Sequence, residues 1–168
     1  MALQSDQTAG KMKKRMFRIR CPFCGHSFQI MRDTLVIEGM DSHASRRLRN
    51  RTYFAHQCSQ CHRMYDLVYP LILRCVDRFA IVLNAQCSPK DFGEPVYECS
   101  SPRQFYELYG ILSDGADWRI VLRLENRLKQ NYNCDVIYES FDMENSIYYF
   151  YVNDRIMAVK YKKEHNEI

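Results

Sequence analysis

The front half of the chain alternates apolar and polar residues over short stretches, a pattern typical of half-buried strands. FRIR (17–20) and HSFQIM (26–31) flank a CPFCG turn, and TYFAHQ (52–57) and HRMYDLVY (62–69) flank CSQC. Each set predicts a β hairpin with a cysteine pair at its tip. Between the hairpins, TLVI predicts a strand, and MDSHASRRLRNR predicts a short helix or arm.

The second half mixes strands with a helical period. LILRCVDRFAIVLN (71–84) predicts two strands that turn near Val76–Asp77, and QCSPKDFGEP predicts a loop because prolines and a glycine interrupt it. A helix is predicted to start here, with Ser101 as its N-cap and Pro102 at its first position. Gln104, three residues after the cap, completes a capping box. A second helix is predicted from DWRIVLRLENRLKQ, and a short turn between the two predicts antiparallel packing. CDVIYES, SIYYFYV and RIMAVKY predict three closing strands separated by DMEN and ND.

Composition narrows the class of protein. The 168 residues suit one ordinary domain, or a small metal-stabilised module joined to a second small core. No apolar run is long enough to span a bilayer, and the N-terminal segment lacks a signal-peptide core, so we expect a soluble, cytoplasmic protein without membrane partners. Because the cytosol keeps thiols reduced, eight cysteines indicate metal ligands or buried thiols rather than disulfides.

Charge is distributed unevenly along the chain. Residues 1–75 hold 13 Lys and Arg against 5 Asp and Glu, a net charge of +8, whereas residues 76–168 hold 11 against 15, a net charge of −4. A basic front half can meet an acidic partner, nucleic acid included. It also suits the surroundings of a thiolate-rich metal site.

The two cysteine pairs, Cys21 with Cys24 and Cys58 with Cys61, predict a metal site. A C-x-x-C pair on a tight turn places two sulfurs on one side, and two such pairs complete the tetrahedron of a zinc ion. Gly25 follows the first pair, where a knuckle turn favours positive φ. His62 must take that place in the second knuckle, with some conformational strain.

Arginines near the predicted site could offset its charge. Four thiolates around Zn²⁺ leave a net charge of −2, and Arg18, Arg20 and Arg63 lie beside the cysteines in sequence. These arginines are equally consistent with an ordinary exposed basic face.

Two alternatives to metal binding stay open. The 33 residues between Cys24 and Cys58 exceed the spacing of a compact zinc ribbon, so ordinary thiols are one alternative. CPFC also resembles the motif of thioredoxin-like redox enzymes, in which a helix after the pair stabilises the thiolate. The alternation after Cys24 predicts a strand there instead, which disfavours redox catalysis.

Other candidate residues carry weaker signals. Cys75, Cys87, Cys99 and Cys134 lack metal-ligand spacing and are predicted to be free thiols rather than a second metal site. Histidines in the front half could act as ligands or bases, but structural or solvated roles are more ordinary; they are His26, His43, His56 and His62. The arm carrying Arg46, Arg47, Arg49 and Arg51 could contact a phosphate backbone or an acidic protein face, or be a solvated helix.

The sequence resembles the CpXC family of bacterial and archaeal proteins. The resemblance rests on CPFCGHSF, the long intervening segment, CSQC with the strand ending VYPL, and RFAIVLN, and it covers residues 16–160. It places Cys21 and Cys24 in the first motif and Cys58 and Cys61 in the second, which here lacks the proline. The family implies no established activity, so the resemblance sharpens fold and site rather than function.

Together these observations predict an α+β protein: zinc-ribbon-like hairpins with two cysteine knuckles, extended antiparallel strands, an antiparallel helix pair and C-terminal strands. Residues 1–14 form a disordered basic tail, 15–84 the zinc-ribbon-like module, and 97–162 the helices and closing strands, packed with the module as one domain. Four cysteine ligands leave no open position on zinc, so a binding module with a protein partner is the leading hypothesis. A nucleic-acid-binding regulator is second, and an enzyme third.

Overall fold

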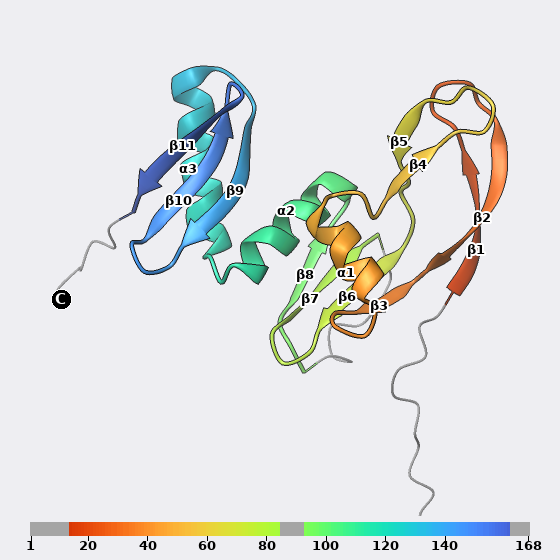
Figure 1. The fold of residues 1–168 in the computed structure, drawn as a ribbon, viewed down its shortest axis with the longest axis horizontal. Helices are drawn as coiled ribbons and strands as arrows, with labels where there is room; N and C mark the ends of the chain where they lie inside the picture. Colours follow the sequence, from red (N-terminus) through yellow and green to blue (C-terminus); the bar gives the residue numbers. More distant parts are fainter. Residues whose placement is uncertain (1–13, 85–92, 162–168) are drawn as a thin grey trace, which may run out of the picture. The chain divides into compact units, whose positions relative to one another are not determined.

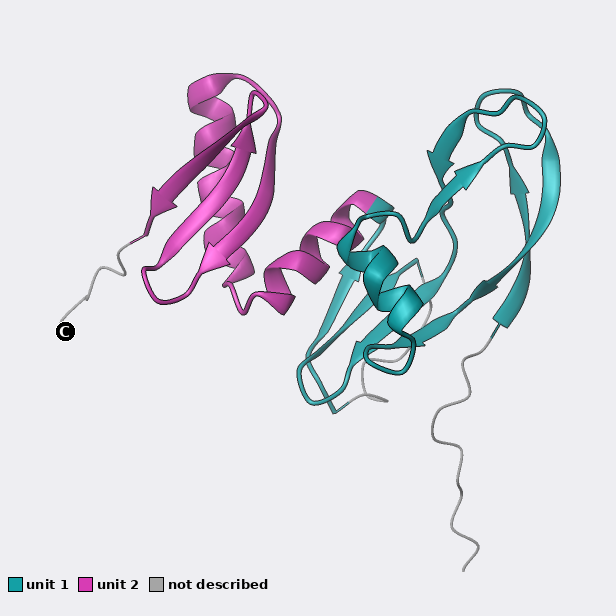
Figure 2. Cartoon of the chain, viewed as in Figure 1, with its two compact units in different colours: residues 1–102 teal, residues 103–168 magenta. Residues whose placement is uncertain are grey.

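The computed structural model describes residues 14–84 and 93–161. The chain divides into two compact units, unit 1 (residues 1–102) and unit 2 (residues 103–168), coloured separately in Figure 2. Within the described ranges, three helices and several antiparallel sheets give the α+β class that the sequence predicts (Figure 1). The predicted disordered tail lies outside the described residues, except for Lys14, which opens the first strand.

Two antiparallel hairpins in unit 1 carry the cysteine pairs. β1 (Lys14–Arg20) pairs with β2 (Ser27–Asp33), and β4 (Ala55–Gln57) pairs with β5 (Met64–Asp66). Half-buried and exposed positions alternate along most of β1 and β2, as the apolar pattern of these strands requires. Both predicted hairpins are therefore present, and we call the pair the cysteine lobe (residues 14–33 and 55–66).

A four-stranded sheet forms the rest of the strand structure of unit 1. Its order is β3-β6-β7-β8, with β3 (Leu35–Ile37), β6 (Leu71–Cys75), β7 (Phe79–Leu83) and β8 (Val96–Cys99). β6 and β7 are antiparallel, but β3 runs parallel to β6 and β8 runs parallel to β7. This sheet is mixed, unlike the antiparallel strands expected from the sequence, because its edge strands arrive by long connections rather than hairpin turns.

An ion pair fixes the turn between β6 and β7. Arg74 donates from Nε to both carboxylate oxygens of Glu94 at 3.1 Å and from Nη2 at 2.9 Å, and the backbone N–H of Asp77 also donates to Glu94 at 3.0 Å. The Arg74 hydrogen bonds, followed by the Asp77 backbone bond, lower the pKa of Glu94. The Glu94 side chain is 2% exposed, so its charge is paired as a buried charge must be.

Unit 2 contains a three-stranded antiparallel meander. β9 (Val136–Asp142), β10 (Ile147–Val152) and β11 (Arg155–Lys160) lie in the order β11-β10-β9. Asn153 and Asp154 both have positive φ, 49° and 59°, the requirement of a two-residue hairpin turn whose twist matches its strands. The three closing strands and the ND turn are thus confirmed.

One helix of unit 2 covers this sheet. α3 (Trp118–Tyr132) follows Asp117, whose carboxylate accepts the backbone N–H of Arg119 at 2.9 Å as an N-cap. Its apolar stripe packs with the inward side chains of β9 and β10 into a buried core comprising Ile111, Ala116, Ile120, Val121, Leu124, Leu128, Val136, Tyr138, Tyr148, Phe150 and Val152. The helical period read from the sequence therefore marks the buried face.

The relation between the two helices differs from the antiparallel pair that was expected. α2 (Pro102–Ser113) begins at Pro102, as predicted, and its C-terminal end reaches the core of unit 2 through Ile111. The two helices meet near their connecting turn and then diverge (Figure 1). The sheet, not α2, covers the apolar face of α3. The grouping of residues 15–84 and 97–162 into one packed domain stays a prediction.

Candidate metal centre

The two cysteine turns have matching backbone geometry. The N–H of Gly25 donates to the carbonyl of Cys21 at 3.0 Å, and the N–H of His62 donates to the carbonyl of Cys58 at 2.9 Å. Gly25 has a φ of 74° and His62 a φ of 57°. The second knuckle therefore places a histidine in the left-handed region where the first has glycine, as the sequence predicts.

Each knuckle is closed at its base by a further backbone bond. The N–H of Cys21 donates to His26 at 2.8 Å, and the N–H of Cys58 donates to Arg63 at 3.0 Å. The strands leading into and out of each turn are thereby held together. The first cysteine of each pair is fixed at the end of a strand, and the second is carried on the turn.

The four sulfurs lie close together without being bonded. The Sγ atoms of Cys21 and Cys61 are 3.7 Å apart, and those of Cys24 and Cys58 are also 3.7 Å apart. All four ligand atoms lie within 4.8 Å of one another. A tetrahedral ion with metal–sulfur bonds of about 2.3 Å requires sulfur–sulfur edges of about 3.8 Å. This cluster is therefore compatible with binding one metal ion.

Burial divides the cluster in the same way in both knuckles. Cys21 and Cys58 are buried, whereas Cys24 is exposed and Cys61 is intermediate. Burial by itself would raise the pKa of Cys21. Hydrogen bonds from backbone N–H groups and neighbouring thiols outweigh burial and lower this pKa to about 7. The backbone bond from His26 lowers the pKa of Cys24, but desolvation and three neighbouring thiols together raise it to about 11. Negative charges on sulfurs this close together repel one another, and a bound cation relieves that repulsion.

A chain of aromatic rings joins the two hairpins behind the cysteines. Phe28 of β2 stacks on His56 of β4 at 4.7 Å between ring centroids, and His56 meets Tyr65 edge-on at 5.6 Å. Tyr65 in turn meets Phe23 at 6.2 Å. Burial, followed by the charge of Arg32, lowers the pKa of His56. His56 thus serves as a packing group between the hairpins, the structural role that the sequence favoured.

Two of the three arginines expected near the cluster contact the knuckles. Arg20 donates from Nε to the carbonyl of Gly25 at 3.2 Å, and the guanidinium of Arg63 lies 5.0 Å from the centroid of the Phe23 ring. Arg18 is exposed on β1, opposite Gln29. The knuckles thus have cationic side chains bound to their backbone and ring.

The other described cysteines lie apart from this site. Within residues 14–84 and 93–161, the four-cysteine cluster is the metal-compatible group found, and Cys75, Cys99 and Cys134 do not join one. Burial is the main cause that raises the pKa of Cys75, and it raises the pKa of Cys99 to about 11. These are properties of unreactive thiols. Cys87 lies outside the described residues.

The predicted arm is the helix α1 (Ser42–Arg49), capped by the carboxylate of Asp41. Arg46, Arg47 and Arg49 occupy its last turn, where cations stabilise the helix dipole. Arg47 also donates to the carbonyls of Thr52 at 2.7 Å and Tyr53 at 3.2 Å. Arg47 therefore has a local structural role that the sequence pattern does not reveal, whereas Arg46 and Arg49 are exposed.

Comparison with known proteins agrees with the cysteine pattern. The model of the CpXC protein family matches residues 19–161, most of the chain. This chain belongs to the CpXC family. No match was found among curated proteins or among solved structures. In the part of the chain that the structure describes, no helix is both long and apolar enough to cross a membrane.

Proposed function

We propose that Cys21, Cys24, Cys58 and Cys61 bind one structural Zn²⁺ in this CpXC protein. The observation that carries the proposal is the sulfur arrangement, with two cross-knuckle distances of 3.7 Å, close to the edge of a zinc–sulfur tetrahedron. Four thiolates in a tetrahedron favour zinc or iron over the oxygen-preferring cations. Zinc bound by four cysteines keeps no position for water or substrate, so the ion would organise structure rather than chemistry.

The function we propose is that of a cytoplasmic interaction module. None of the seven described cysteines forms a disulfide, which supports a reducing compartment. The cysteine lobe exposes Phe23 and Met64 by 50% and 59% beside basic residues of the knuckles. Exposed apolar side chains next to cations are common at protein interfaces. A protein partner with an acidic face is the proposal that fits this surface best.

We further propose that α1 and the turn that follows it contact the partner, through Arg46, Arg47, Arg49 and Arg51. Within this set, Arg46 and Arg49 are the exposed members of the last helical turn and would make the contact. Arg47 would contribute by holding the segment that follows the helix, because it donates to two backbone carbonyls there.

Metal analysis of native protein tests the zinc proposal directly. We expect one zinc per chain, and we expect Cys21→Ser to lose the metal while Cys134→Ser, outside the cluster, retains it. The four thiols should resist alkylation until a chelator is added, because bound thiolates are protected. A native protein with another metal, or with none, would contradict the proposal, and rapid labelling of Cys21 in metal-loaded protein would favour redox chemistry.

The arm is tested by replacing Arg46 and Arg49 with alanine together. With a protein partner, we expect slower association and nearly unchanged dissociation, since charges at an interface rim act mainly on encounter. The second candidate, nucleic-acid binding, is supported by the same exposed arginines. It predicts that the slope of log K against log salt flattens by about two for the double variant. Unchanged capture of every partner by this variant would reject the arm as a contact surface.

A further inference from the structure

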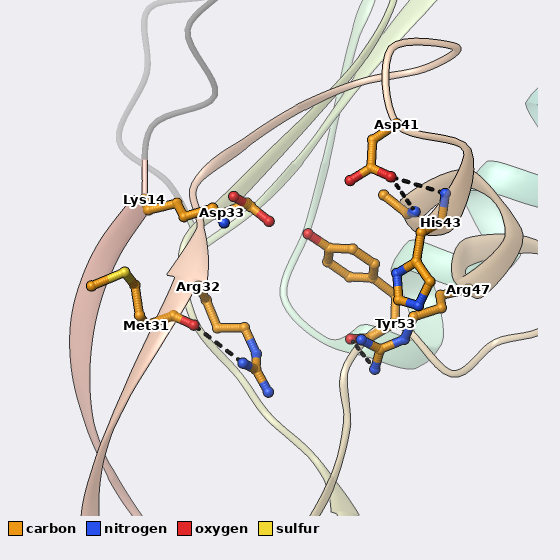
Figure 3. Close-up of a pocket in the computed structure, with 9 residues that line it drawn as sticks. Lys14, Met31, Arg32, Asp33, Asp41, His43, Arg47 and Tyr53 are labelled. Atoms are coloured by element: carbon orange, nitrogen blue, oxygen red, sulfur yellow. Dashed lines mark hydrogen bonds between the residues drawn. The ribbon is translucent and has the colours of Figure 1, made fainter.

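A cavity of about 220 Å³ lies in unit 1 at the open end of the first hairpin, away from the cysteines. Residues from β1, β2, α1 and the segments on either side of α1 line it, as Figure 3 shows: Lys14, Met31, Arg32, Asp33, Asp41, His43, Ala44, Arg47 and Tyr53. All of these residues are described, and none is a cysteine of the candidate metal centre. The cavity is therefore a feature of unit 1 that is separate from the candidate metal centre.

Nitrogen-bearing side chains reach this cavity from three elements. Lys14 comes from β1, Arg32 from β2, and His43 and Arg47 both come from α1. Like charges gathered in one concave site repel one another unless an anion neutralises them. Two guanidinium groups arriving from different elements suit an anion with several oxygens, because each group can donate more than one hydrogen bond.

The carboxylates of the cavity do not cancel this charge equally. Asp41 is engaged as the cap of α1, where one oxygen accepts the backbone N–H groups of His43 at 2.9 Å and Ala44 at 3.1 Å. Asp33 is different, because its Oδ1 atom is buried and has no hydrogen-bond partner. The Nε atom of Arg32 is likewise buried without a partner. Arg32 and Asp33 thus both line the cavity, and each carries one polar atom that the protein covers and leaves without a partner.

Tyr53 gives the cavity a fixed wall. This residue is 6% exposed, and Figure 3 shows its ring between the strand residues Arg32 and Asp33 and the helix residue His43. Arg47 holds the backbone at this point through the Tyr53 carbonyl, and its guanidinium lies 5.8 Å from the centroid of the Tyr53 ring. The wall is therefore set by contacts made without a ligand, as expected of a preformed site.

We propose that this cavity binds a small organic phosphate. The phosphate group lies among the guanidinium groups of Arg32 and Arg47 and the imidazole of His43. A hydroxyl of the ligand donates to the carboxylate of Asp33, whose charge would otherwise repel the anion. A carboxylate would use fewer of the donors, because its two oxygens lie in one plane. The proposal goes beyond the zinc and interaction functions and does not depend on either.

Titration of full-length, metal-loaded protein followed by two-dimensional NMR tests this site, with glycerol 3-phosphate as the probe. We expect saturable shifts at residues of the cavity, weaker binding of inorganic phosphate, and no binding of glycerol. Arg32→Gln should weaken both phosphate probes at least about tenfold, because a charge-assisted bond is lost. Asp33→Asn should weaken glycerol 3-phosphate while leaving inorganic phosphate as tight or tighter.

The matched control is Arg18→Gln, which removes the same charge from the same hairpin on an exposed position outside the cavity. It should leave affinity within about twofold, since a distant exposed charge is largely screened. Equal weakening by Arg18→Gln and Arg32→Gln, or no saturation by 10 mM glycerol 3-phosphate at about 0.1 M salt, overturns the proposal. If Arg32→Gln loses metal or folds poorly, His43→Gln at an exposed position replaces it, with the same expected direction.

Discussion

The cysteine lobe and the sheet of unit 2 are both built from short antiparallel strands, yet their interiors differ. Across β1, β2, β4 and β5 no residue is fully buried. In unit 2, β9 and β10 bury Val136, Tyr138, Tyr148, Phe150 and Val152 beneath α3. Small β structures that lack an apolar interior need another source of stability, which a metal can supply. One chain thus combines a region with little buried surface around its cysteines and another with an apolar core.

The largest expected effect separates these two regions by removing the metal. Adding chelator to native protein should abolish ordered structure at the knuckles and in β1, β2, β4 and β5, because their strands have little buried surface of their own. Backbone amides of β9 and β10 should stay protected from hydrogen exchange, since none of the four candidate metal ligands lies in their core. Hydrogen exchange measured residue by residue gives the result. Simultaneous loss of protection in both regions would show that they unfold as one unit.

A core substitution should produce the reverse pattern. Phe150 is fully buried in the unit 2 core, so Phe150→Ala should lower the free energy of unfolding of that unit by about 3–5 kcal/mol. Zinc content should remain that of wild type, because the cysteine lobe is unchanged. Tyr151→Ala, the next residue on β10 and 38% exposed, is the matched control and should change stability by about 0.5 kcal/mol or less. Loss of metal in the Phe150 variant would show that the cysteine lobe depends on the core of unit 2.

A buried acid makes the stability of unit 2 depend on pH. Glu125 of α3 is 3% exposed, and its Oε1 atom has no hydrogen-bond partner. Burial, followed by the neighbouring Glu107 carboxyl, raises the pKa of Glu125 from 4.5 to about 8, although Lys129, 3.8 Å away, opposes the shift. Because the folded state holds this proton more tightly, unit 2 should lose stability as pH rises from 4.5 to about 8 and level off above.

Glu125→Gln tests this dependence, because a neutral amide cannot ionise. Thermal melts of the variant should be flatter than wild type between pH 4.5 and 8. Glu107→Gln should flatten the pH dependence of stability only in part, since it removes one cause of the raised Glu125 pKa and leaves burial in place. A wild-type slope in Glu125→Gln would assign the pH dependence to other groups.

The same contrast explains what could be read from the sequence. The hairpins of the cysteine lobe could be predicted because alternation and C-x-x-C spacing are patterns within a few residues. The same holds for α3 and for the ND turn. Pairing over long connections had no such signal. β3 and β8 join their neighbours in parallel across segments of many residues, and β8 is only four residues long. The partner of the α3 face was also decided by tertiary packing rather than by its helical period.

Side-chain roles in the candidate site divide in the same way. The four cysteines and the turn positions Gly25 and His62 followed from spacing. The binding of Arg47 to the carbonyls of Thr52 and Tyr53, and the ring chain through His56, did not, since they depend on which surfaces meet after folding. A run of arginines in the sequence shows only that the segment is basic. The fold is needed to distinguish a structural arginine such as Arg47 from an exposed one such as Arg46.

The smallest expected effect compares the knuckles themselves. Both turns need positive φ, and histidine adopts it less readily than glycine. Gly25→Ala should destabilise the metal-loaded lobe by about 1–2 kcal/mol, and its new Cβ would also lie 3.3 Å from the Arg20 guanidinium. His62→Gly should stay within about 1 kcal/mol of wild type, because the relieved strain is offset by the freedom of glycine in the unfolded chain. Chelator competition compares the variants through their zinc affinity. Equal weakening by both substitutions would show that the His62 side chain supports its knuckle beyond its backbone conformation.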